Sequence, residues 1–108
     1  MTAARAGAAR HQYPVIDEAA LVAARAGDRL VAAARARGAT RWVAYFEPLP
    51  DRLRDEAIGD LRRTGLRARA AYGPKDSVRD VLPEDVTEPF LDAIDRLLKV
   101  LARHEVGG

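Results

Sequence analysis

Apolar side chains recur at helical spacing in the last long segment of the chain, from Thr87 to His104. Four large residues follow one another at steps of four, three and four, which places them on one face of an α-helix. These residues are Phe90, Ile94, Leu97 and Leu101. Burying them together with Leu98 is worth roughly 7–15 kcal/mol before the entropic cost of folding, which is an upper bound. We therefore expect the rest of the chain to pack around this helix.

A second long helix is predicted from Pro14 to Arg37, with Asp17 as its N-cap and Gly38 as the residue that ends it. Its uncharged face is wide and consists mostly of alanine, so neighbouring elements can approach it closely. We expect this face to exceed what one chain can cover and to bind a protein partner or a second copy, giving a homodimer. The candidate interface residues are Ala23, Ala26, Leu30, Ala34 and Trp42.

A third long helix is predicted from Asp51 to Tyr72, because the apolar residues of this stretch fall on one side of a helical wheel. Gly73 followed by Pro74 is typical of a helix end. Between the third helix and the final one we expect a short helical turn capped by Asp76. Thr87 is the predicted N-cap of the final helix.

The aromatic segment 41–47 is open to two interpretations. Trp42, Tyr45 and Phe46 have high β-strand propensity, but a strand needs a partner. The candidate partner is segment 66–72, where apolar residues alternate with arginines, although its alanines make it a poor strand. The competing interpretation is a short helix capped by Thr40, with the aromatic side chains turned into the core.

The pattern as a whole predicts an all-α fold, a bundle of three long helices plus one or two short ones. The alternative is an α+β fold with a small two-stranded sheet formed by 41–47 and 66–72. The length of 108 residues is typical of one domain. We expect residues 1–13 to be a disordered basic lead-in and residues 14–106 to form a single helical domain.

Composition adds a charge gradient to this picture. The net charge is only +2, but residues 1–42 carry 7 basic and 3 acidic groups, whereas residues 74–108 carry 5 basic and 8 acidic groups. The chain has 22 alanines and 16 arginines against 2 lysines, which is typical of a GC-rich genome. This bias weakens any argument that arginine was selected over lysine for a function.

No pattern typical of catalysis or cofactor binding occurs in the sequence. The chain lacks cysteine, and neither His11 nor His104 has a second histidine at ligand spacing, so no metal site is expected. Ser77, the single serine, is expected to cap a turn and not to act as a nucleophile. We therefore expect no cofactor and no catalytic residues, and a protein that is not an enzyme.

Two functions remain after this exclusion. The first is a non-catalytic helical interaction, adaptor or accessory protein that acts through self-association or a protein partner. The alternative is a nucleic-acid-binding regulatory protein, since an arginine stripe can bridge phosphates. The stripe consists of Arg62, Arg63, Arg67 and Arg69. No apolar run approaches the ~20 residues that span a bilayer, so no membrane role and a cytoplasmic location are expected.

Overall fold

The computed structural model describes residues 9–107, with side chains described as far as Glu105. The fold is all-α, a helical bundle, and no strand occurs within residues 9–107. The elements are the 3-10 turn η1 (Arg10–Gln12), the helices α2 (Pro14–Ala36), α3 (Thr40–Phe46), α4 (Leu49–Asp55) and α5 (Ile58–Ala70), the 3-10 turn η2 (Val78–Asp80) and the helix α6 (Glu84–Gly107). The helical interpretation of 41–47 is confirmed, and the two-stranded sheet with 66–72 is wrong.

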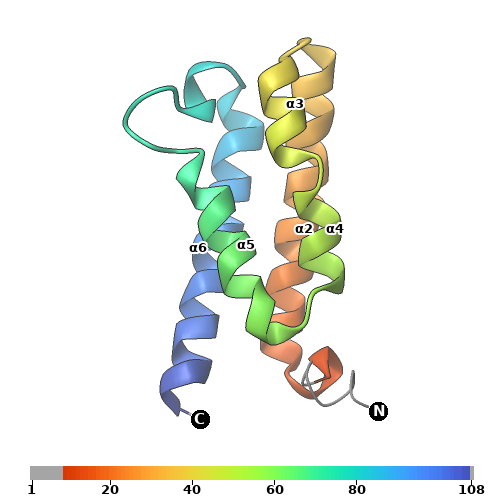
Figure 1. Cartoon of the computed structure of the whole chain (residues 1–108), viewed down its shortest axis with the longest axis vertical. Coiled ribbons are helices and arrows are strands. Elements are labelled where there is room, and N and C mark those ends of the chain that lie inside the picture. Colours follow the sequence, from red (N-terminus) through yellow and green to blue (C-terminus); the bar gives the residue numbers. More distant parts are fainter. Residues whose placement is uncertain (1–8, 108) are drawn as a thin grey trace.

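The two longest helices, α2 and α6, lie antiparallel and side by side (Figure 1). α3 and α4 follow α2 back along its length, and α5 packs against α6. The result is an elongated molecule of 43 × 26 × 19 Å. The start of α2 and the end of α6 meet at one end of the bundle, and this end carries the candidate site described below.

The small residues of α2 explain why several helices can pack on it. Seven of its ten buried residues are alanine or glycine. At Gly27 an added Cβ would lie 3.1 Å from Phe90 of α6 and 3.3 Å from Pro50 of α4. α2 is therefore packed from two sides at the same level, and the wide uncharged face that the sequence shows is covered within the chain.

The turn between α2 and α3 is set by Gly38, as predicted. Gly38 adopts a φ of 65°, in the left-handed region that favours glycine. Its N–H donates to Arg35 O at 3.0 Å, and the N–H of Ala39 donates to Ala34 O at 2.9 Å, which is the Schellman pattern. The chain then reverses, and Trp42 and Phe46 of α3 become buried.

The predicted third helix is divided, which corrects the expectation of one helix from Asp51 to Tyr72. α4 already begins at Leu49, and α5 begins at Ile58. Between them Glu56 and Ala57 adopt extended backbone, with ψ of 147° and 156°. The division lets α4 pack on α2 while α5 packs on α6, a change of direction that one straight helix cannot make.

Four predicted caps are also wrong. α2 has Tyr13 as its N-cap, and Asp17 instead lies in the first turn and pairs with Arg10. α6 begins at Glu84, so Thr87 lies inside the helix.

The third of these corrections concerns the short turn before α6. Its cap is Ser77, whose Oγ accepts the N–H of Arg79 at 3.1 Å, and not Asp76, which adopts a positive φ of 53°. The expectation that Ser77 caps a turn is confirmed. At the start of α3, Thr40 provides no cap, and Ala39 occupies the cap position.

Part of the predicted disordered lead-in is ordered. Residues 10–12 form η1, and Arg10 is anchored at the α4–α5 junction through hydrogen bonds to Leu53 O at 2.8 Å and Glu56 O at 2.9 Å. Its Nε also pairs with Asp17 at 2.9 Å. The expectation for residues 1–8 lies outside the described residues.

Candidate functional site

The five predicted interface residues lie inside the folded chain. Ala23, Leu30 and Ala34 are fully buried, and Ala26 and Trp42 are exposed by only 5% and 4%. α3, α4 and α6 cover the face of α2 that carries four of them. The structure thus corrects their assignment to an exposed surface, because the wide face of α2 is used for internal packing.

The four arginines of the predicted nucleic-acid face are all exposed on α5. Two of them have structural contacts of their own. Arg69 forms an ion pair with Asp95 of α6. The guanidinium carbon of Arg67 lies 4.6 Å from the ring centroid of Tyr45, and the hydroxyl of Tyr45 donates to Arg67 O at 2.6 Å. No described ion pair includes Arg62 or Arg63.

Ser77 and His104 lie near opposite ends of α6. Ser77 precedes η2, and Arg79 of η2 pairs with Glu88 near the start of α6. His104 lies sixteen residues beyond Glu88, which is about 24 Å along a helix axis. The structure therefore does not bring the single serine and this histidine together.

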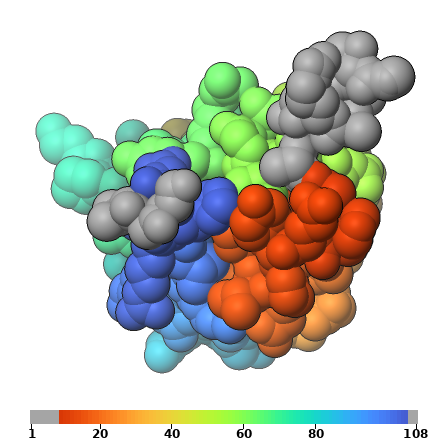
Figure 2. Space-filling view, turned by 90° about the horizontal axis from the view of Figure 1, so that it is seen from below, coloured from red at the N-terminus to blue at the C-terminus, as the bar shows by residue number. Residues whose placement is uncertain are grey.

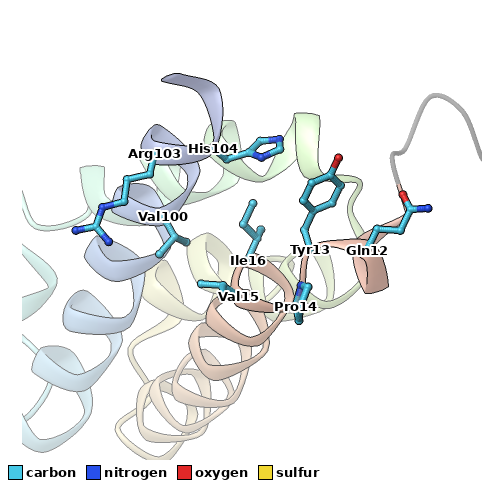
Figure 3. Close-up of a pocket in the computed structure, with 8 residues that line it drawn as sticks. All are labelled: Gln12, Tyr13, Pro14, Val15, Ile16, Val100, Arg103 and His104. Atoms are coloured by element: carbon cyan, nitrogen blue, oxygen red, sulfur yellow. The ribbon is translucent and has the colours of Figure 1, made fainter. Parts of the chain in front are cut away.

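The feature that sequence reasoning missed is an apolar groove between the start of α2 and the end of α6. It has a volume of about 410 Å³. Its lining residues are Gln12, Tyr13, Pro14, Val15, Ile16, Val100, Arg103 and His104 (Figure 3). Figure 2 looks onto this end of the molecule, where the blue end of α6 and the red start of α2 lie side by side.

Valines from both helices give the groove its apolar character. Val15 is 57% exposed, the highest value among the exposed large apolar residues in the described part of the chain. Val100 is partly buried and packs on the core, and Ile16, which also lines the groove, is 4% exposed. An exposed valine beside a core surface is a place where a further apolar side chain can be buried at little structural cost.

An aromatic pair joins the two helices at one side of the groove. The rings of Tyr13 and His104 meet edge to face, with centroids 4.8 Å apart and an interplanar angle of 74°. Such contacts hold rings in a defined orientation. In Figure 3 the two rings point toward one another across the gap between the helices, while Arg103 stands at the α6 edge.

The charge around the groove is positive. None of its lining residues is acidic, and Arg103 is the residue among them that always carries a charge. The two carboxylates in the first turns of α2 are already paired. Asp17 accepts from Arg10 at 2.9 Å, and Glu18 accepts from Arg96 at 3.1 Å.

A second groove, between α5 and α6, is occupied by its own ion pairs. Arg69 pairs with Asp95, and Arg79 binds Glu88 through two hydrogen bonds of 2.9 and 2.8 Å. The hydrogen bond from Arg79 lowers the pKa of Glu88 below its usual value. Burial raises the pKa of Tyr72, whose hydroxyl donates to the backbone. These charges already have partners, so this groove has less to offer a ligand.

Comparison of the chain with protein-family models, with curated proteins and with solved structures finds no match. Among residues 9–107, no three acidic, histidine or cysteine side chains gather closely enough to hold a metal ion. No described helix combines the length and apolar character needed to cross a bilayer.

Proposed function

We propose that this protein is a non-catalytic interaction module that binds a segment of a partner protein in the groove between α2 and α6. The observation that supports this function is the apolar lining formed by exposed Val15, partly buried Val100 and the core residue Ile16. Burying apolar area is the main driving force of protein association, and a groove between two helices suits the side chains of a third segment.

This proposal replaces the face of α2 as the binding surface but keeps the adaptor role predicted from the sequence. The groove is small, so its affinity comes from one or two apolar side chains of the partner. Burying one such side chain supplies about 1.5–3 kcal/mol. Binding of this kind is suited to reversible assembly and not to a permanent complex.

The nucleic-acid alternative has weaker support from the geometry. Arg67 and Arg69 already contact Tyr45 and Asp95, which leaves Arg62 and Arg63 for phosphate contacts. Two phosphate contacts would give a shallow dependence of affinity on salt. Fluorescence anisotropy with labelled DNA and RNA at two salt concentrations distinguishes this alternative from the proposed function.

The test compares two valine substitutions that have the same chemistry. Val15→Gln makes the groove polar without changing its charge, whereas Val81→Gln alters another exposed valine outside the groove. Each biotinylated protein is first shown to be folded by circular dichroism. It is then used to capture partners from an extract of its native cells for identification by mass spectrometry.

We expect a partner that the unaltered protein and Val81→Gln retain and that Val15→Gln loses. The lost protein is then produced in pure form and titrated against all three proteins by calorimetry. An identical set of captured proteins for all three, or equal affinities in calorimetry, would contradict a role of the groove in binding.

A further inference from the structure

We infer that the segment bound in the groove is acidic and amphipathic, with an apolar side chain between the helices and a carboxylate on Arg103. This inference rests on the proposed function and specifies the partner that the groove selects. Apolar lining alone accepts many segments, so the selection comes from the charge at its edge.

The first step concerns the exposure and the ion pairing of Arg103. It is exposed on α6, and no carboxylate among the described side chains lies within ion-pair distance of it. It lies one helical turn beyond Val100, so both residues can contact the same partner segment. An arginine placed beside an apolar surface can bind a carboxylate through two parallel hydrogen bonds.

The second step is the neutralisation of the acids nearby. Asp17 and Glu18 would otherwise repel an acidic partner at the start of α2. Both are held by arginines, Arg10 and Arg96, which come from η1 and α6. Among the residues that line the groove, the fixed charge that a partner meets is therefore that of Arg103, although the last third of the chain is acidic overall.

The third step is the geometry of the groove. The groove lies between two antiparallel helices, whose lining residues Figure 3 shows. It is open to solvent, which suits an amphipathic helix better than an enclosed small molecule. On such a helix, a leucine and a glutamate three or four residues apart lie on one face. The leucine would contact Val15 and Val100, and the glutamate would reach Arg103.

The experiment uses three synthetic helical peptides that share one leucine stripe and differ in their flanking residues, which are glutamate, glutamine or lysine. Each peptide is titrated into the full chain labelled with ¹⁵N, and amide shifts locate the bound site. We expect shifts at Val15, Val100 and His104. We expect the glutamate peptide to bind about three- to tenfold more tightly than the glutamine peptide, with a preference that decreases at high salt.

Charge reversal makes the test specific. In Arg103→Glu we expect the order of affinities to invert, so that the lysine peptide binds most tightly. Arg62→Glu reverses an exposed arginine on α5, outside the groove, and is expected to keep the original order. Circular dichroism shows that each variant is folded before titration.

Different outcomes overturn the inference and the proposed function separately. Equal affinities for the three peptides, an unchanged order in Arg103→Glu, or no shift at the groove with any peptide overturns the inference. In each case a partner lost by Val15→Gln but retained by Val81→Gln leaves the proposed function in place. Concentration-dependent dimerisation that Val15→Gln abolishes would identify a second copy as the occupant and would overturn the inference as well.

Discussion

Arg10 shows how one side chain can join three parts of the molecule. Its guanidinium contacts a carboxylate at the start of α2 and two carbonyl oxygens, those of Leu53 and Glu56, at the α4–α5 junction. The carbonyls at the end of a helix have no intrahelical donors, so Arg10 supplies bonds that α4 cannot make itself. An arginine in an alanine-rich lead-in carries no sequence signal of this role, because the carbonyls that it binds lie more than forty residues away.

We predict that Arg10→Ala lowers the free energy of unfolding by about 2–3 kcal/mol, because partly buried carbonyls and a carboxylate lose a charged donor. The measurement is urea unfolding at neutral pH. Arg25→Ala is the control, since Arg25 is exposed on α2 and takes part in no described ion pair. Equal stabilities of the two variants would show that Arg10 does not stabilise the junction.

Tyr72 connects the turn after α5 to α6 through its hydroxyl, which donates to Thr87 O at 2.6 Å. Burial raises the pKa of Tyr72 above its ordinary value. Below about pH 10 this tyrosine is neutral in both folded and unfolded chains, and its contribution is fully present. Above that pH the unfolded chain ionises first, so stability decreases as the pH rises.

We predict that Tyr72→Phe lowers the free energy of unfolding by about 0.5–1.5 kcal/mol at neutral pH, because the variant lacks this hydrogen bond. The variant should then lose less further stability than the unaltered protein as the pH rises above about 10. Urea unfolding at a series of alkaline pH values measures both effects. Because Tyr13 and Tyr45 are present in both proteins, the difference between the two curves isolates Tyr72. Parallel curves would contradict the assignment.

At the scale of helices, the presence of a helix is easier to predict than the residues at which it begins and ends. The spacing in α6 gave its buried face correctly: Phe90, Ile94, Leu97 and Leu101 are all buried. The division of α4 from α5 was not predictable from spacing, because apolar residues of both helices fit one wheel. The break is set by packing, since α4 packs on α2 whereas α5 packs on α6. Tertiary contacts therefore override a pattern that is locally consistent with one helix.

The close approach of helices at Gly27 leads to a prediction with a matched control. Gly27→Ala would place a Cβ 3.1 Å from the ring of Phe90, which is buried and packs edge to face on Phe46. We expect a net destabilisation of about 1–2 kcal/mol, because crowding outweighs the better helix propensity of alanine.

The control for this prediction is Gly59→Ala in α5, where no atom lies within 4 Å of the added Cβ. There alanine should stabilise the protein by up to about 1 kcal/mol. Thermal unfolding of both variants measures the two effects. A stabilising Gly27→Ala would mean that Phe90 and Pro50 can move apart without cost.

At the scale of the molecule, the sequence predicted the fold class but placed the interface in the core. The alanine-rich face of α2 looked too wide for one neighbour, and in the structure it has three, α3, α4 and α6. The groove was missed because its two halves come from opposite ends of the chain. The signals available were Val15 and Val100, which lie at the margins of the apolar stripes, and no spacing rule relates two such distant residues.

The single continuous core predicts cooperative unfolding of the described domain. Buried residues of η2 and all the helices belong to one hydrophobic cluster, which includes Trp42, the only tryptophan. We therefore expect Trp42 fluorescence and helical circular dichroism to report the same midpoint in urea. A fluorescence transition at lower urea concentration would show that α3 separates from the bundle before the rest unfolds.

The contact between Tyr13 and His104 joins the start of α2 to the end of α6, at the end of the bundle where both described ends of the chain lie. A mechanical load applied through these ends therefore acts across the groove. It pulls α6 away from α2 one turn at a time, and the helices do not slide past one another under shear. We expect rupture to begin at the edge-to-face rings, and a partner segment bound as proposed between Val15 and Val100 would raise the force at which it starts.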